Sequence, residues 1–540
     1  MIESQNEQRA TLNLVPDGSS SGLTSLPESV LTQHRARMLD PATAARVPGY
    51  VADGPTAYRT EELLVPHDLQ VDTLNQVLGF DLGLVLKRDG DEKTRCRLVP
   101  DEDVGRRKAR VEKGMPAAID VDAWKALQTL RSATLAGDDR LNNSPGLKEA
   151  VEKISLNRLL IGSAMGGIGG MSTLQGVPGA IGGNPDPGAG PGDLGYWRFP
   201  VAVQLPPAQR SDDADTPRRP VIAVLDTGIG KNSWLGIVDE NDLGSFVSID
   251  PAIQEKVTSP TSHNSIGSYW DHPSTGTPLT GYLSTHTGHG AFVIGIIHQV
   301  EPDADVLSIR VMHEDGIVHT DVLITVLERL ALRVEAAQAA NDEERMIDVV
   351  SLSLGGYRED STQPAKFDML AEKINELRAL GVVVVASAGN YASAREFWPA
   401  ALATRIVEDE ITEGPPVVSV GARNPNGTKT LFTNDAIWVT TWALGAGVVS
   451  TFPENTDGSG NPRYRVIAEN AAADDRLGIR ESLETDNFGS GYAIWAGTSF
   501  AAPAVAAQIA RLLKESPEAE LSQRTTLKRA KAAVRKILGQ

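Results

Sequence analysis

The sequence contains a single cysteine, Cys96, among its 540 residues, so no disulfide can form within the chain. No stretch approaches the roughly 18 consecutive apolar residues that a membrane-spanning helix needs. Residues 1–35 also lack the basic start and apolar segment of a secretion signal. We therefore expect a cytoplasmic protein with no membrane partner, in a compartment that keeps thiols reduced.

Positive charge is scarce as well. The 51 Lys and Arg residues stand against 70 Asp and Glu residues, which gives a formal net charge of −19. Proteins that bind nucleic acid usually present a basic face, so we expect no nucleic-acid partner. At 540 residues the chain is long for one domain, and two or three units with a large core are expected.

The first 163 residues divide into two parts. Residues 1–55 are polar and lack sustained periodicity, which predicts a flexible leader. Residues 56–163 follow the order strand, helix, strand, strand, helix, strand, which is typical of a split βαβ unit of ferredoxin-like type. Its expected strands lie at 60–67, 82–88, 94–100 and 154–162, and Asp68 and Asp122 are the expected helix caps. The following residues, 164–198, are rich in Gly and Pro and predict a flexible linker.

From residue 199 to residue 540 the chain alternates strands and helices. Short, continuous apolar runs at 220–226, 304–312, 347–354, 381–389 and 416–422 are typical of parallel strands covered on both faces. Helices are expected near 320–340 and 366–380, and a basic surface helix at the C-terminal end. This pattern predicts a doubly wound, mostly parallel α/β sheet whose functional residues lie at the carboxyl ends of its strands.

Three polar residues mark the ends of these elements. Ser499, in GTSFAAP, lies where an apolar strand turns into a helix, and free N–H groups and the helix dipole stabilise negative charge there. A serine nucleophile needs a base and a group that orients the base. Asp226 ends an apolar strand, and His289 begins a helix of small residues. The chain order Asp, His, Ser is that of subtilisin.

These motifs, in this order, resemble those of the subtilisin-like serine proteases of the peptidase S8 family. The resemblance implies a triad of Asp226, His289 and Ser499 and hydrolysis of peptide bonds through an acyl-enzyme. It also assigns Asn390, in the AGN motif, to the oxyanion site, with support from the Thr498 hydroxyl.

The resemblance extends to the substrate channel. SLSLGG at 351–356 is similar to the family's substrate-binding strand, and residues 386–389 are similar to the opposite wall of the pocket for the residue before the cut. The predicted substrate-binding residues are Ser353, Leu354, Gly355, Ala388 and Gly389. The partners implied are a peptide or protein substrate and the chain's own residues 56–163, which resemble an inhibitory prodomain. We expect self-cleavage between about residues 162 and 195; the alternative is an unrelated α+β domain that recognises a partner.

Other readings of the motifs remain open at this stage. The D-T-G at Asp226 also fits one lobe of an aspartic protease, but no second such motif is present. His286 competes with His289 as the base, and H-T-G-H suggests metal ligands without a third ligand at zinc spacing. A serine esterase is disfavoured because G-x-S-x-G is absent at Ser499. An inactive relative that serves as a binding module is the main alternative.

Two segments lengthen the chain relative to compact family members, residues 231–285 and 453–490. They are expected to be solvated loops, to shape specificity, or to bind calcium through clustered carboxylates. The resemblance implies no required cofactor, no catalytic metal, and at most a structural calcium ion.

Overall fold

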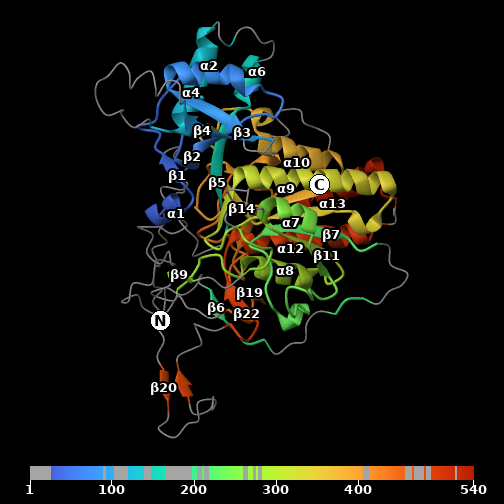
Figure 1. Cartoon of the computed structure of the whole chain (residues 1–540). Helices are drawn as coiled ribbons and strands as arrows, with labels where there is room; N and C mark the ends of the chain where they lie inside the picture. The colour runs from blue at the N-terminus through green and yellow to red at the C-terminus, as the bar shows by residue number, and fades with distance from the viewer. Residues whose placement is uncertain are drawn as a thin grey trace, which may run out of the picture.

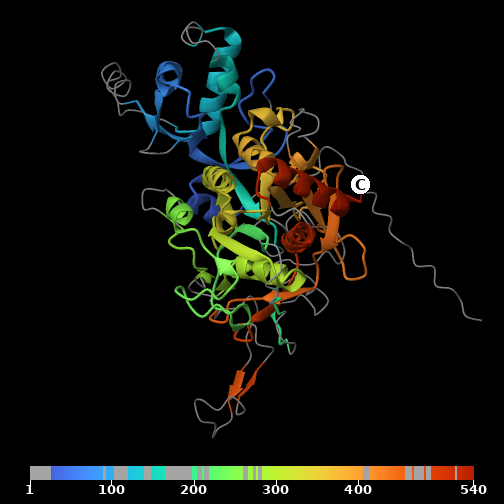
Figure 2. The ribbon, with the colours of Figure 1, turned by 90° about the vertical axis from the view of Figure 1, so that its right-hand side faces the viewer.

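The computed structural model describes residues 26–539, apart from 51, 89–92, 102–119, 139–140, 142–146, 165–197, 204–208, 212–217, 259–265, 272–274, 278–281, 405–413, 457–464, 468–478, 482–487 and 517–519. The predicted linker at 164–198 therefore lies outside the described residues except at its two ends. We call residues 26–162 the N-terminal unit and residues 198–539 the C-terminal unit. Figures 1 and 2 show the N-terminal unit at one end of the larger C-terminal unit.

A parallel sheet forms the centre of the C-terminal unit. Within the described residues it has seven strands in the order β18-β17-β15-β13-β7-β11-β8, and every neighbouring pair is parallel. The strands are β7 (Val221–Asp226), β8 (Val247–Ser248), β11 (Asp305–Arg310), β13 (Val349–Leu352), β15 (Val383–Ser387), β17 (Val418–Arg423) and β18 (Thr441–Leu444). The mostly parallel α/β sheet expected from the sequence is thus confirmed.

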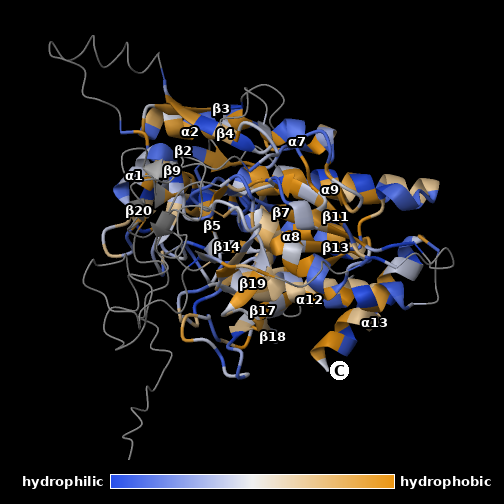
Figure 3. Cartoon of the chain, turned by 90° about the horizontal axis from the view of Figure 1, so that it is seen from below, coloured by the Kyte–Doolittle hydropathy of each residue, from blue (hydrophilic) through white to orange (hydrophobic). Residues whose placement is uncertain are grey.

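Helices cover both faces of this sheet, because alternate residues of its strands are apolar on both sides. In β7, Ala223 and Leu225 belong to one core, whereas Ile222 and Val224 belong to the other. The first core includes residues of α7 (Pro251–Thr258), α9 (Thr320–Ala340) and α10 (Met369–Ala379). The second includes residues of α8 (His289–Val300), α12 (Thr498–Lys514) and α13 (Gln523–Leu538). Figure 3 shows both polar and apolar residues along α9 and α13, as expected of helices that cover a core.

The N-terminal unit has its own antiparallel sheet and core. Its elements are β2 (Thr56–Leu64), α2 (Val71–Asp81), β3 (Leu84–Arg88), β4 (Arg95–Pro100), α4 (Ala123–Ala136), α6 (Leu147–Glu152) and β5 (Ser155–Gly162). The four strands lie side by side in the order β5-β2-β4-β3. Asp122 caps α4 as expected, by accepting a hydrogen bond from the Lys125 N–H. Asp68 does not cap α2, which follows Gln70 and continues past Gly79.

The predicted leader at 1–55 needs a correction in the part that the structure describes. Residues 28–33 form helix α1 (Glu28–Gln33), and β1 (Ala36–Leu39) pairs with β2 in antiparallel fashion. Leu26, Val30 and Leu31 are buried in the first core of the C-terminal unit. A helix of six residues is too short to produce a visible period in the sequence, so its two apolar residues, Val30 and Leu31, gave no signal.

Strand β5 belongs to both units. Its first half pairs with β2 of the N-terminal unit, at Ser155, Leu156 and Arg158. Its second half lies between β12 (Ile317–His319) and β14 (Leu354–Tyr357) of the C-terminal unit, antiparallel to both. β14 pairs in turn with β16 (Phe397–Trp398). The result is one continuous sheet that runs from the N-terminal unit into the C-terminal unit.

Smaller elements complete the C-terminal unit. β6 (Phe199–Pro200), β19 (Val448–Thr451) and β22 (Tyr492–Trp495) form a short sheet. β9 (Thr275–Thr277) pairs with β10 (Tyr282–Leu283), and β20 (Arg465–Ile467) with β21 (Ile479–Glu481), in a ribbon that projects from the body in Figure 1. Part of the 231–285 segment is packed into the core, where the Asn232 side chain donates hydrogen bonds to the carbonyls of Phe452 and Gly491. Among the described helices, none is long and apolar enough to cross a membrane.

Candidate active site

Asp226 and His289 meet at the carboxyl end of the central sheet. Asp226 is the last residue of β7, and His289 is the first residue of α8. The Nδ1 atom of His289 lies 2.7 Å from the Oδ1 atom of Asp226, and both side chains are buried. A carboxylate only accepts hydrogen bonds, so Nδ1 carries the proton and Nε2 presents its lone pair. Within the described residues, Nε2 has no hydrogen-bond partner.

Ser499 lies beside this pair, in the first turn of α12. The ring of the next residue, Phe500, lies 5.4 Å from the ring of His289. The Ser499 hydroxyl donates to the carbonyl oxygen of Ser353 at 3.0 Å rather than to His289 Nε2. The residue after Ser499 thus packs against His289, while the Ser499 hydroxyl points toward Ser353. Proton transfer from Ser499 to His289 would first require a rotation of the Ser499 side chain.

Two donors converge on the carbonyl oxygen of Ser163, which directly follows β5. The Nδ2 atom of Asn390 lies 2.6 Å from this oxygen, and the backbone N–H of Ser499 donates to it at 3.0 Å. Asn390 Oδ1 accepts hydrogen bonds from the hydroxyl and from the N–H of Thr498, both at 2.9 Å. The Thr498 hydroxyl therefore donates its proton in a hydrogen bond to Asn390. Thr498 orients the amide, and its hydroxyl does not contact the carbonyl itself.

The predicted substrate-binding strand contacts the end of β5. The Ser163 N–H donates to the carbonyl oxygen of Ser353 at 3.0 Å. Leu354 pairs with Gly162, and Gly355 pairs with Ile161. All three residues predicted on this wall therefore border the chain that leads to Ser163.

At residues 386–389, the predicted opposite wall of the pocket, the polar contact comes from a residue that is not among the predicted substrate-binding residues. Ser387 Oγ donates to Ser163 Oγ at 2.9 Å, so the side chain of Ser163 faces this wall. The Ala388 N–H donates to the carbonyl of Val420, and the Gly389 N–H donates to the Thr498 hydroxyl. Ala388 and Gly389 thus help to shape the wall and position Thr498, while the polar contact comes from Ser387.

His286, which the sequence offers as the alternative to His289 for the base, lies beside Gly162. It is buried, its Nδ1 lies 3.1 Å from the Thr285 hydroxyl, and its ring centroid lies 5.2 Å from that of His289. Burial, together with the neighbouring His289, lowers the pKa of His286 to about 3, so its ring is neutral. A Cβ atom placed on Gly162 would lie 2.7 Å from His286 Nε2, and one on Gly316 would lie 2.2 Å from its Nδ1. The ring therefore leaves no room for a side chain at either glycine.

Asp271, in the predicted 231–285 segment, holds the start of α8. Its Oδ2 atom accepts hydrogen bonds from the Gly288 N–H and from the Thr227 hydroxyl, each at 2.8 Å. The Thr227 hydroxyl also accepts a hydrogen bond from the Gly290 N–H at 3.0 Å. Burial raises the pKa of Asp271 to about 6, although Arg310 and these hydrogen bonds oppose the shift. The network joins the residues after Asp226 to the residues on either side of His289.

The residues that the sequence interpretation missed are Ser163, Gly316, strand β12 and Asp271. β12 has three residues, too few for a period, and Ser163 belongs to no motif. Asp271 was passed over inside a segment expected to be a loop. Only the glycines at 162 and 316 give a sequence signal, and a single glycine is ambiguous.

Comparisons with known proteins place the chain in a family. The family model for the subtilase family matches residues 218–538, which is more than half of the chain. The chain belongs to the subtilase family. This is a family of serine proteases, subtilisin-like hydrolases of the peptidase S8 class.

Individual relatives are distant. Subtilisin DY of Bacillus licheniformis is 24% identical over 189 residues, which cover 32% of this chain and 57% of that subtilisin. The chain thus spans little more than half the length of this curated relative. A crystal structure of a lanthipeptide protease is 21% identical, with 57% of this chain and 78% of that chain covered and a TM-score of 0.34.

Proposed function

We propose that this subtilase is a serine endopeptidase that acts through Asp226, His289 and Ser499, and that residues 56–163 are its inhibitory prodomain. The observation that carries the proposal is the position of the Ser163 carbonyl, held between Asn390 Nδ2 and the Ser499 N–H. These are the donors that an oxyanion requires during peptide hydrolysis. The end of β5 thus lies in the channel as a substrate would, and the bond to be cut is Ser163–Ala164.

The chemistry follows from this arrangement. His289 Nε2 takes the Ser499 proton as Ser499 Oγ attacks the Ser163 carbonyl carbon, and the oxyanion is stabilised by Asn390 Nδ2 and the Ser499 N–H. The imidazolium, held by Asp226, then gives the proton to the departing nitrogen of Ala164. Water, activated by His289, hydrolyses the ester between Ser163 and Ser499, which yields the Ser163 carboxylate and the free serine.

The N-terminal unit supports the prodomain role in two ways. The order β5-β2-β4-β3 of its antiparallel sheet is compatible with the ferredoxin-like arrangement expected for such a unit. Its last strand also fills the channel between β12 and β14, so no other peptide can pair with these strands while it is there. No cofactor takes part in these steps; a structural calcium ion and a cytoplasmic location stay predictions.

The test is the site of self-cleavage in the full chain. We expect purified wild-type protein to contain a fragment that begins at Ala164, by intact mass and N-terminal sequencing. Ser499→Ala should stay uncut, whereas Ser245→Ala, which removes an exposed serine of the same unit, should be cut like wild type. A wild-type chain that stays whole, or one cut only outside this bond, would contradict the proposed prodomain geometry.

A second candidate function is a catalytically inactive binding module. It is favoured by one observation, the hydrogen bond from Ser499 Oγ to Ser353 in place of His289. A fluorophosphonate probe separates the two functions, because it reacts only with an activated serine. Labelling of wild type but not of Ser499→Ala supports the peptidase; a chain neither cut nor labelled supports the binding module.

A further inference from the structure

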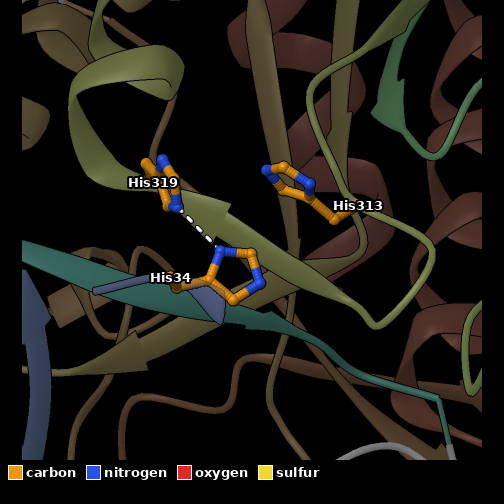
Figure 4. Close-up of side chains that lie close together, drawn as sticks. All are labelled: His34, His313 and His319. Atoms are coloured by element: carbon orange, nitrogen blue, oxygen red, sulfur yellow. Dashed lines mark hydrogen bonds between the residues drawn. The ribbon is translucent and has the colours of Figure 1, made fainter. Parts of the chain in front are cut away.

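Three buried histidines gather where the N-terminal segment contacts the C-terminal unit. His34 follows helix α1, while His313 and His319 lie at the two ends of the segment that contains β12. Their exposed fractions are 2%, 3% and 5%. Figure 4 shows the three rings around a common space, with His34 from the N-terminal segment and His313 and His319 from the segment that contains β12. None of them takes part in the proposed catalytic chemistry.

The ring nitrogens have the spacing of ligands around one ion. His34 Nδ1 lies 3.0 Å from His319 Nε2. One ring nitrogen from each histidine lies within 4.8 Å of the other two. Tetrahedral zinc with Zn–N bonds of about 2.0–2.1 Å separates neighbouring nitrogens by about 3.3 Å. The pair at 3.0 Å therefore needs to open slightly, and the third ring to approach, for all three to reach one ion.

Asp315 fixes which nitrogen of His34 faces the space between the rings. Its Oδ2 atom lies 2.8 Å from His34 Nε2, and its Oδ1 atom accepts the Ile317 N–H at 3.1 Å. A carboxylate can only accept, so His34 Nε2 carries the proton and Nδ1 presents a lone pair toward His319. A carboxylate behind a histidine is the usual second partner of a metal-bound imidazole.

We propose that His34, His313 and His319 bind one divalent transition-metal ion, of which Zn²⁺ is the reference case, with water as the fourth ligand. Neutral imidazole suits Zn²⁺, Ni²⁺ and Cu²⁺, whereas Ca²⁺ and Mg²⁺ prefer oxygen ligands. The positive charges near these histidines are Arg59, whose guanidinium lies 3.5 Å from His319 Nε2, together with Arg95 and Arg310. Each has an acidic partner, Glu62 for Arg59, Asp321 for Arg95 and Glu314 for Arg310, and Asp315 adds a negative charge beside His34.

A bound ion would link the start of the N-terminal unit to β12, the strand of the C-terminal unit that pairs with β5. His34 precedes β1, which pairs with β2, and His319 is the last residue of β12, where it pairs with Leu159. An ion bound by both parts stabilises their contact by mass action. The proposal that the three histidines bind a metal ion does not depend on the proposed function. Only the further effect, that the ion helps to retain a prodomain, rests on it.

The experiment uses the full chain with Ser499→Ala, which does not require peptidase activity. After treatment with EDTA, the protein is dialysed against ZnSO₄, and bound zinc is measured by mass spectrometry of the metal. We expect one Zn²⁺ per chain, an increase in Tm on its addition, and intense Co²⁺ absorption bands typical of a tetrahedral site. His34→Ala should weaken binding at least 100-fold and abolish the shift in Tm. His67→Ala, which removes an exposed histidine of the same unit, should change neither.

Two outcomes would overturn the proposal. One is that the Ser499→Ala chain, with all three histidines present, retains less than one tightly bound zinc ion. This measurement needs no histidine variant, so a folding defect cannot explain it. The other is unchanged stoichiometry and affinity in both His34→Ala and His319→Ala, which would place the ion elsewhere. Because Ser499→Ala is inactive under the proposed function, metal binding can succeed or fail whether or not the chain is a peptidase.

Discussion

The end of β5 is tightly packed against one side chain, that of His286. Gly162, next to Ser163, faces the buried ring of His286, and a Cβ atom there would lie 2.6 Å from the ring carbon Cδ2. It would also lie 2.9 Å from the sulfur of Met312, which is flexible and can move. The imidazole is the rigid obstacle. The position before Ser163 is therefore restricted to glycine by His286.

Gly162→Ala should slow cleavage of the Ser163–Ala164 bond. Overpacking of this kind costs about 1–3 kcal/mol, which corresponds to about 5- to 150-fold in rate if it is lost from the transition state. The measurement is the rate at which the cut form appears on denaturing gels. The double variant Gly162→Ala/His286→Ala should recover most of the rate, with His286→Ala alone as the control. Equal rates in Gly162→Ala and wild type would contradict the role of His286.

The sequence predicted those candidate site residues that lie in short, recognisable motifs. Asp226, His289, Asn390 and Ser499 each lie in a short motif at the end of a strand or the start of a helix. In the structure, His289 contacts Asp226, and Asn390 and Ser499 both donate to the carbonyl of Ser163. Ser163 has no such motif. Its position follows from the register of β5 against β14, which depends on the whole docked N-terminal unit, so no local pattern could reveal it.

Among the elements, the central strands were the easiest to predict and the short ones the hardest. All five expected strands of the C-terminal unit are present, because each is a continuous apolar run buried on both faces. The expected strand at 347–354 is divided at Ser353 into β13 and β14, which belong to different sheets. Helix α1 and strand β12 were missed because six and three residues, respectively, carry no period.

The start of α8 depends on Asp271 as well as on its own residues. Asp271→Ala removes the acceptor for the Gly288 N–H and the Thr227 hydroxyl, at a cost of about 1–3 kcal/mol for each buried donor left unpaired. We expect slower self-cleavage and a lower Tm, because the helix that carries His289 loses its anchor. Asp271→Asn keeps an acceptor oxygen and should be milder. Cleavage and Tm unchanged in Asp271→Ala would show that α8 is held by other contacts.

Across the whole molecule, buried charges join the two units. Arg158 of β5 lies 2.6 Å from Asp368, the N-cap residue of α10, and 3.5 Å from Glu359. Burial opposes the ionised form of Asp368, but Arg158 and Arg358 outweigh it and lower the pKa of that carboxyl. Both carboxylates therefore depend on the docked position of β5.

Arg158→Met should loosen this contact strongly. Removal of one partner from a buried pair typically costs about 3–5 kcal/mol, whereas an exposed pair is worth at most about 1 kcal/mol. In the Ser499→Ala chain, we expect amides of β5 to exchange with solvent at least 100-fold faster. Lys93→Met, which removes an exposed pair with Glu328 across the same two units, is the matched control. Equal protection in the two variants would contradict a structural role for the buried pair.

Acid should weaken the fold through His286. Burial lowers the pKa of His286 from 6.5 to about 3. Between pH 3 and pH 6.5, the imidazole is therefore protonated more readily in the unfolded chain than in the folded one. The stabilisation is fully present above pH 6.5 and is lost as the pH falls toward 3. Asp271, with its pKa raised to about 6, contributes in the opposite direction. We expect the urea midpoint of Ser499→Ala to fall more steeply from pH 7 to pH 4 than that of Ser499→Ala/His286→Asn; parallel curves would contradict this.

The pairing of β5 with strands of both units has a consequence for the time course of activation under the proposed function. A cut after Ser163 breaks the covalent link but removes none of the pairings of residues 155–162 with β2, β12 and β14. If the N-terminal unit is the prodomain that we propose, the severed piece would stay bound as a product inhibitor until the whole unit departs or is digested. Onset of turnover would then show a lag whose length is governed by undocking, and traces of already liberated enzyme would shorten it.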